Sequence, residues 1–199
     1  MKILGLTGPS GSGKAVIGAA FSSRGIPVLD TDAVYHAWIE KPTACTQELA
    51  AVFGHAVLNS DGGIDRRRLA AIVFADDGEK TARLDRLNRI THRYVLESCR
   101  IWLEEQKKLG CRAAVIDAPL LIEAGLHMTC DAVIAVLAPR EVRLSRIVLR
   151  DGISREAAEA RVSSQKPDAF YEEHADFIFV NDGSVADADR FVEKLVLDL

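Results

Sequence analysis

The sequence predicts an α/β protein in which a five-stranded parallel sheet is flanked by helices. Short apolar runs recur along the chain, and segments with helical spacing separate them. The first run leads directly into a glycine-rich loop and a helix, as in parallel α/β proteins that bind nucleotides. The first four runs end at or just before residues able to do chemistry, which parallel strands would gather at one edge. The five runs are residues 3–7, 27–29, 113–116, 132–137 and 177–180.

The run at residues 3–7 is followed by Gly-Pro-Ser-Gly-Ser-Gly-Lys-Ala, residues 8–15. Its first seven positions match the loop Gly-x-x-x-x-Gly-Lys-Ser/Thr, which binds nucleoside polyphosphates. Glycines let the backbone N–H groups approach phosphate oxygens, and the helix that follows directs its positive end at the same anion. A Gly/Ser-rich surface turn is the alternative, but the strand before the loop and the helix after it favour the phosphate loop. The residues expected to bind the nucleotide are Gly8, Gly11, Ser12, Gly13, Lys14 and Ala15.

Ala15 departs from the loop pattern, because it occupies the position of the Ser or Thr whose hydroxyl binds magnesium. Magnesium prefers six oxygen ligands but usually keeps several waters. One more water could fill the position of the hydroxyl. We therefore expect weaker handling of magnesium-bound nucleotide, but not loss of nucleotide binding.

Acidic residues follow the second and third apolar runs. Asp30 and Asp32 lie where a strand ends and a helix begins, and for Asp30 capping of that helix is an equal alternative. Asp32 is the better candidate for accepting a proton from an attacking hydroxyl. Asp117 closes the third run and is expected to hold magnesium, directly or through water. The segment 118–123, with Leu120, either lines a substrate cleft or forms a packed turn.

Between the second and third runs, residues 33–109 have helical spacing and are too numerous for a simple crossover. We interpret them as an inserted helical subdomain. Small helical insertions in a nucleotide-binding core commonly carry the second substrate. The apolar stripes at residues 69–74 and 84–95 are interpreted as packing of this insert.

Four arginines recur at helical spacing after the fourth run, and they share about a third of the helix circumference. A solvated face paired with nearby acidic residues is one interpretation. The other is a lid, about residues 140–165, whose arginines bind phosphate and which closes to exclude water. The four residues are Arg140, Arg143, Arg146 and Arg150.

The composition is that of an ordinary globular protein with one substantial core: 199 residues, 48% hydrophobic and 27% charged. The net charge of −4 gives no basic footprint for nucleic acid, and no apolar stretch approaches the about 20 residues that span a bilayer. We expect neither nucleic acid nor membrane as a partner. The glycine loop interrupts any signal-peptide core, and four scattered cysteines indicate reduced thiols, so we expect a cytoplasmic protein. They are Cys45, Cys99, Cys111 and Cys130.

Taken in order, the motifs resemble those of dephospho-coenzyme A kinases over nearly the whole chain. The phosphate loop alone is shared by a vast superfamily, whereas the ordered set of the other motifs is specific. The set comprises Leu6-Thr7-Gly8, Asp30-Thr31-Asp32 with His36, Phe53-Gly54, Asp61-Gly62-Gly63-Ile64-Asp65-Arg66, Leu87-Asn88-Arg89-Ile90-Thr91-His92, Asp117-Ala118-Pro119-Leu120-Leu121-Ile122-Glu123, Arg150-Asp151-Gly152-Ile153-Ser154, Gln165, Ala175-Asp176-Phe177 and Asn181-Asp182-Gly183-Ser184.

The resemblance implies a single P-loop kinase domain over residues 1–199, with a coenzyme-binding insert at about 33–109 and a lid at about 140–165. It implies transfer of the γ-phosphoryl group of ATP, with Mg²⁺, to the ribose 3′-hydroxyl of dephospho-coenzyme A, the last step of coenzyme A synthesis. One departure besides Ala15 is Arg93, where a proline commonly follows the helical histidine. The implied roles are Asp32 as catalytic base, Lys14, Arg140 and Arg150 on the triphosphate, Asn181 near adenine, and Arg66 and His92 on the coenzyme.

Two alternatives stay open at this point. Ala15 motivates a catalytically degraded homologue that binds a nucleotide or coenzyme A without turnover. A kinase of nucleoside monophosphates would share the loop and the lid. The sequence carries no indication of the oligomeric state.

Overall fold

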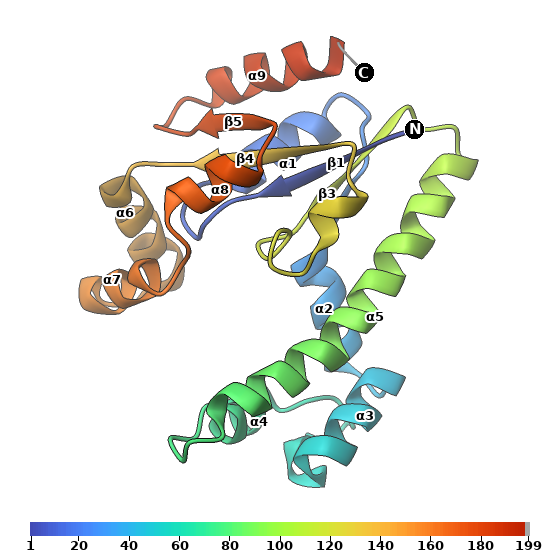
Figure 1. Cartoon of the computed structure of the whole chain (residues 1–199), viewed down its shortest axis with the longest axis vertical. Coiled ribbons are helices and arrows are strands. Elements are labelled where there is room, and N and C mark those ends of the chain that lie inside the picture. Colours follow the sequence, from blue (N-terminus) through green and yellow to red (C-terminus); the bar gives the residue numbers. More distant parts are fainter. Residues whose placement is uncertain (198–199) are drawn as a thin grey trace. The chain divides into compact units, whose positions relative to one another are not determined.

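The computed structural model describes residues 1–197 and divides the chain into two compact units (Figure 1). The core unit comprises Met1–Asp30 and Leu103–Leu199, and the helical unit comprises Thr31–Trp102. Each unit has its own hydrophobic core.

The core unit contains a five-stranded sheet in the order β2-β3-β1-β4-β5, and all its strand pairs are parallel. This confirms the predicted sheet. β3 is fully buried from Ala113 to Ile116, which explains its continuous apolar sequence. The strands are β1 (Lys2–Thr7), β2 (Val28–Asp30), β3 (Ala113–Asp117), β4 (Ala132–Leu137) and β5 (Phe177–Val180).

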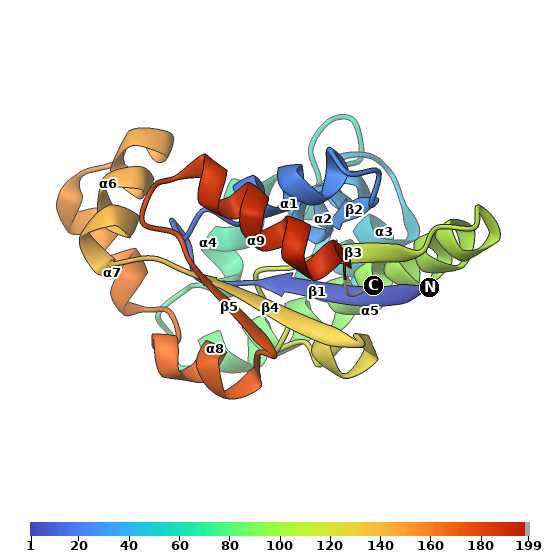
Figure 2. The same ribbon diagram turned by 90° about the horizontal axis from the view of Figure 1, so that it is seen from above.

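Helices cover both faces of this sheet (Figure 2). α1 (Lys14–Ser22) and α9 (Val185–Leu197) pack on one face, where Phe21 and Val192 are fully buried against the strands. α8 (Asp168–His174) lies on the opposite face, where Tyr171 packs with residues of β4. The short helix η2 (Leu126–Thr129) follows β3. The central strands β1, β3 and β4 are therefore largely shielded from water on both sides, whereas three of the four residues of the edge strand β5 are exposed.

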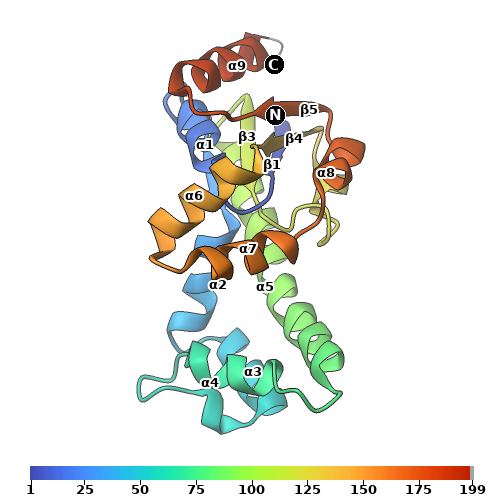
Figure 3. The same ribbon diagram turned by 90° about the vertical axis from the view of Figure 1, so that its left-hand side faces the viewer.

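β4 leads into a helical hairpin made of α6 (Arg140–Asp151) and α7 (Arg155–Ser163) (Figure 3). Gly152 ends α6 in the left-handed conformation, with φ 63°, and so permits the sharp turn. A small apolar core holds the two helices together, and its buried members are Leu144, Ile147, Ala158 and Val162.

The helical unit is built from α2 (Thr31–Glu40), α3 (Ala44–Phe53), η1 (His55–Val57), α4 (Arg66–Val73) and the first part of α5 (Lys80–Lys108). Its core includes Leu69, Val73 and Ile90, which confirms that the apolar stripes are packing. Phe74 differs from the other predicted residues of its own stripe. It follows the end of α4, is 53% exposed, and lies beneath the ammonium group of Lys80.

Within residues 1–197, no helix combines the length and the apolar character that crossing a membrane requires. The four cysteines are thiols. Burial raises the pKa of Cys45 and of Cys99 to about 11, so both behave as neutral core residues.

Candidate nucleotide-binding site

In the loop between β1 and α1, the backbone conformation and the close neighbours require glycine at two or more positions. Gly8 has φ 145°, and a Cβ there would lie 2.1 Å from the carbonyl oxygen of Val136 in β4. Gly13 has φ 90°, and a Cβ there would lie 2.2 Å from the side-chain nitrogen of Asn181. Neighbouring segments therefore pack directly against the loop backbone, where no side chain fits.

Helix α1 begins at Lys14 with no side-chain cap. Gly13 occupies the N-cap position, makes no capping hydrogen bond, and no acidic residue lies in the first turn. The first N–H groups of the helix and its positive dipole end thus lack the usual side-chain partner. Together with the glycine loop, this is the arrangement that binds phosphate.

The structure brings Lys14 and Asp117 together, as expected for residues at one edge of a parallel sheet. β1 pairs with β3 so that Leu6 faces Asp117, which places the end of β3 beside the start of the loop. The Lys14 Nζ and the Asp117 Oδ1 are 3.8 Å apart, and both side chains are more than four-fifths buried. The predicted phosphate-binding lysine and the predicted magnesium-associated carboxylate thus form one ion pair.

Ala15 follows Lys14 in the first turn of α1 and is exposed. Its methyl group offers no ligand to a cation. Among residues 1–197, no group of three or more His, Cys, Asp or Glu residues is arranged to hold a metal ion.

Two of the four arginines of α6 point at the protein itself. Arg143 is only 5% exposed, and its Nε donates to the carbonyl oxygen of Ser10 at 3.1 Å. Its other donors reach the Gln165 Oε1 at 2.7 Å and the Asp168 carboxylate at 3.5 Å. Burial lowers the pKa of the Arg143 guanidinium from its usual value. Arg143 therefore fastens the loop to the hairpin and to α8.

Arg146 reaches the next part of the same loop. It donates to the carbonyl oxygens of Gly11 at 3.2 Å and of Ser12 at 3.0 Å. It also donates to the side-chain oxygen of Asn181 at 3.2 Å, while the Asn181 amide nitrogen donates to the Ser12 carbonyl at 2.8 Å. Asn181 is 5% exposed, so its own bond to Ser12 is buried, whereas the bonds that Arg146 donates are partly buried.

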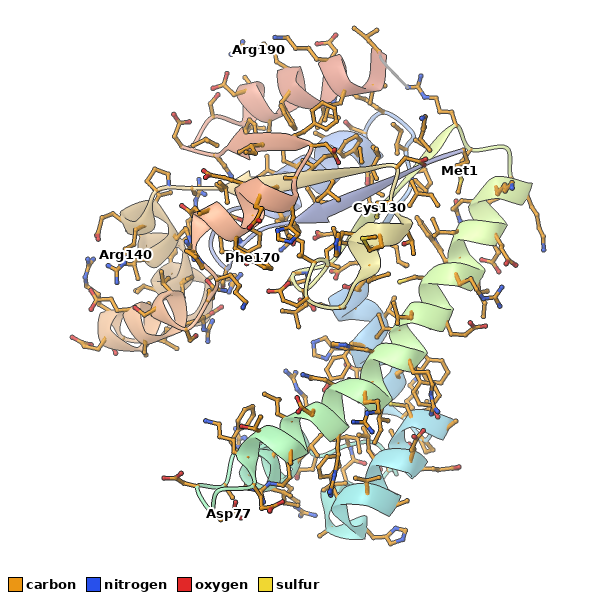
Figure 4. All side chains as sticks on the ribbon, in the orientation of Figure 1. Met1, Asp77, Cys130, Arg140, Phe170 and Arg190 are labelled. Atoms are coloured by element: carbon orange, nitrogen blue, oxygen red, sulfur yellow. The ribbon has the colours of Figure 1, made fainter. Side chains whose placement is uncertain are left out.

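The other two arginines of α6 are exposed. Arg140 is labelled in Figure 4 and lies 3.8 Å from the Glu141 carboxylate. Arg150 donates to the Ser10 hydroxyl at 3.3 Å and pairs with Asp151 at 2.7 Å. Hydrogen bonds from Arg150, and then from Arg161 of α7, lower the pKa of Asp151 to about 2. The four arginines therefore differ in their surroundings: two bond the loop backbone, whereas Arg150 reaches the Ser10 side chain and Arg140 pairs with Glu141 at the surface.

The remaining predicted residues lie as follows. Leu120 follows β3 and is 49% exposed beside the buried Leu121. In the helical unit, Asp32 lies exposed in the first turn of α2, and Arg66 lies exposed at the start of α4. His92 is half-buried in α5, and burial lowers its pKa.

Sequence reasoning missed the roles of Arg146 and Asp168 and the bonds that Asn181 makes with the loop. A helical period shows that arginines share a face, but it does not show which backbone groups that face meets. The bonds from Arg146 to the loop span 134 and 135 residues of sequence, so no local sequence pattern predicts them.

Comparison with known proteins identifies the family. The family model described as dephospho-CoA kinase matches residues 2–187. The chain belongs to the dephospho-CoA kinase family. The dephospho-CoA kinase of Anaeromyxobacter dehalogenans is 39% identical over 202 residues, covering 100% of this chain and 92% of that protein.

Solved structures agree with this family and its fold. A protein from Thermus thermophilus has a TM-score of 0.81 and 34% identity, with 100% of this chain and 97% of that chain covered. A dephospho-CoA kinase from Campylobacter jejuni has a TM-score of 0.71 and 26% identity, with the same coverage. The fold is thus that of the P-loop kinases, as predicted. The relatives do not favour a kinase of nucleoside monophosphates or a degraded binding protein.

Proposed function

We propose that this chain transfers the γ-phosphoryl group of ATP to the ribose 3′-hydroxyl of dephospho-coenzyme A, which completes coenzyme A. The family match along residues 2–187 carries the proposal. The phosphate loop supports it, because Lys14 and Asp117 lie together at the end of the sheet as phosphoryl transfer requires.

The loop and α1 bind the triphosphate. Backbone N–H groups over residues 8–15 surround the phosphates, and Lys14 adds a mobile positive charge. Arg140 and Arg150 of the proposed lid, residues 140–165, offset the charge that develops on the transferred group. Both arginines are exposed on α6, which supports this role.

The acceptor is bound through the insert at residues 33–109, with Arg66 and His92 contacting the coenzyme and Leu120 contributing from the core unit. Asp32 serves as the catalytic base: it accepts the proton of the 3′-hydroxyl and orients that oxygen for attack. The position of Asp32 supports this role, because an exposed carboxylate follows the end of β2 by two residues.

The residues at the loop fit a magnesium ion that keeps most of its waters. Asp117 would hold the ion through water, and the methyl group of Ala15 would supply no ligand, so the remaining ligands would have to be water or nucleotide oxygens. When bound, the ion offsets the charge of the outer phosphates. We place the reaction in the cytoplasm, because the cysteines are scattered thiols.

A coupled ADP-release assay with ATP and dephospho-coenzyme A tests the proposal. We expect turnover that depends on the acceptor at millimolar magnesium, and its absence would refute the proposed function. Asp32→Asn should lose about 10²–10⁴-fold in turnover and keep ATP binding, because it removes the base alone. Asp76→Asn, at an exposed carboxylate of the same unit, is the matched control and should turn over normally.

A further inference from the structure

Three consecutive carbonyl groups of the phosphate loop accept hydrogen bonds from side chains of the core unit. Arg143 donates to the carbonyl of Ser10 at 3.1 Å, and Arg146 donates to those of Gly11 and Ser12 at 3.2 and 3.0 Å. The Asn181 amide adds a second bond to the Ser12 carbonyl at 2.8 Å. The loop backbone is therefore held along one side by charged and amide donors.

These bonds determine the direction of the amide groups that a phosphate would meet. A trans peptide is planar, so its C=O and the N–H of the next residue point in opposite directions. Because the carbonyls of Ser10 and Ser12 are held toward α6 and Asn181, the N–H groups of Gly11 and Gly13 point to the other side. Had either peptide rotated, a carbonyl oxygen would face the anion and repel it.

The orientation of Asn181 is itself fixed. Its backbone N–H donates to the carbonyl of Leu137 at 2.8 Å, which anchors it after β5 beside β4. Arg146 donates to its side-chain oxygen, which leaves the amide nitrogen directed at Ser12. Gly13 allows this approach, because a Cβ there would lie 2.2 Å from the Asn181 nitrogen and 3.4 Å from a guanidinium nitrogen of Arg146.

We propose that Arg146 and Asn181 are positioning residues that hold the phosphate loop in its anion-binding conformation. The inference rests on the proposed function, since it concerns the ATP site. Asn181 then acts on the phosphates through the loop, whereas an adenine contact would act on the base. The two roles differ in whether adenine is needed for the effect to appear.

Binding of ATP and of inorganic tripolyphosphate, measured by calorimetry, separates these roles. The variants are Arg146→Lys, which keeps the charge but cannot bridge several acceptors, and Asn181→Ala. Both should weaken ATP and tripolyphosphate alike, by about tenfold, since each loses bonds that hold the loop. Arg190→Lys is the control, because Arg190 lies exposed on the outward face of α9 and pairs with Asp187 (Figure 4).

Steady-state kinetics provide a readout that a general loss of packing would not give. KM for ATP should rise in both variants, while KM for dephospho-coenzyme A stays at the wild-type value. Arg146→Lys retains a long cationic side chain, so it should keep the wild-type circular dichroism spectrum even if Asn181→Ala does not.

Three outcomes would overturn the inference. Variants that bind both ligands as the wild type does would show that the bonds do not position the loop. Weakened ATP binding with unchanged tripolyphosphate binding would assign Asn181 to the adenine instead. If the wild type bound neither ligand, the proposed function would be refuted, and this inference would fall with it.

Discussion

Gly13→Ala tests how tightly the phosphate loop is packed against its neighbours. The substitution adds one methyl group at φ 90°, 2.2 Å from the side-chain nitrogen of Asn181. Asn181 is buried and anchored by its own backbone, so it cannot yield without breaking its bond to Ser12. The variant should therefore lose both stability and nucleotide affinity.

The expected cost has two parts that a matched variant separates. A left-handed backbone costs an L-residue about 1–2 kcal/mol. Displacing the Asn181 amide leaves buried polar groups unpaired, which adds about 1–3 kcal/mol. Gly25 also has a positive φ, 74°, but a Cβ there would meet nothing within 4 Å. Gly25→Ala should therefore show the first cost alone.

Urea unfolding of the two variants measures the difference, and calorimetry with ATP measures its effect on binding. We expect Gly13→Ala to lose about 1–3 kcal/mol more unfolding free energy than Gly25→Ala. We also expect only Gly13→Ala to bind ATP more weakly. Equal losses of stability together with equal ATP affinities would refute the packing argument.

Three further predictions concern the cation, the hairpin and the buried arginine. Ala15→Ser restores a hydroxyl ligand, so it should lower the magnesium concentration for half-maximal turnover several-fold; an unchanged magnesium titration would contradict this. Because the pKa of Asp151 is lowered from 3.8 to about 2, its ion pairs stabilise the fold above pH about 4 and are lost as the pH falls toward 2. The Tm difference between wild type and Asp151→Asn should thus shrink over that interval, and a constant difference would count against it. Arg143→Met should lose about 2–4 kcal/mol of unfolding free energy in urea, because it leaves buried hydrogen-bond acceptors without a donor. Arg155→Met removes an exposed ion pair that water screens, so it should lose much less unfolding free energy than Arg143→Met; similar losses for the two would show that burial does not matter.

The sheet could be predicted from the sequence because its strands appear as continuous apolar runs. Strands β4 (Ala132–Leu137) and β5 (Phe177–Val180) have the predicted bounds. Strands β1 and β3 each differ by one residue at one end, and β2 is shifted by one residue at both ends. Apolar runs identify such strands because a parallel sheet covered on both faces excludes polar side chains. The loop was predictable for a similar reason, since its glycines are required by the backbone itself.

The arrangement of the arginines could not be predicted in the same way. Arg143 and Arg146 share a helix face with Arg140 and Arg150, but α6 meets the loop along only part of that face. A charge pattern with helical spacing is the same whether its partner is solvent, phosphate or a backbone carbonyl. Tertiary packing determines which of these partners each arginine meets, and the local sequence does not indicate that packing.

This packing also bears on how the proposed lid could move. Arg143, Arg146 and Arg150 all donate to groups of the phosphate loop, so α6 is fastened to the loop at three points. The two helices of the hairpin, α6 and α7, are also joined to each other, because Asp151 pairs with Arg161 of α7 and a small apolar core lies between them. Closure of residues 140–165 as one body would therefore pull on the loop carbonyls and turn the amides that bind phosphate. In this fold, the position of the hairpin and the conformation of the loop are therefore coupled. The coupling runs through arginines to which the sequence pattern assigns phosphate binding alone.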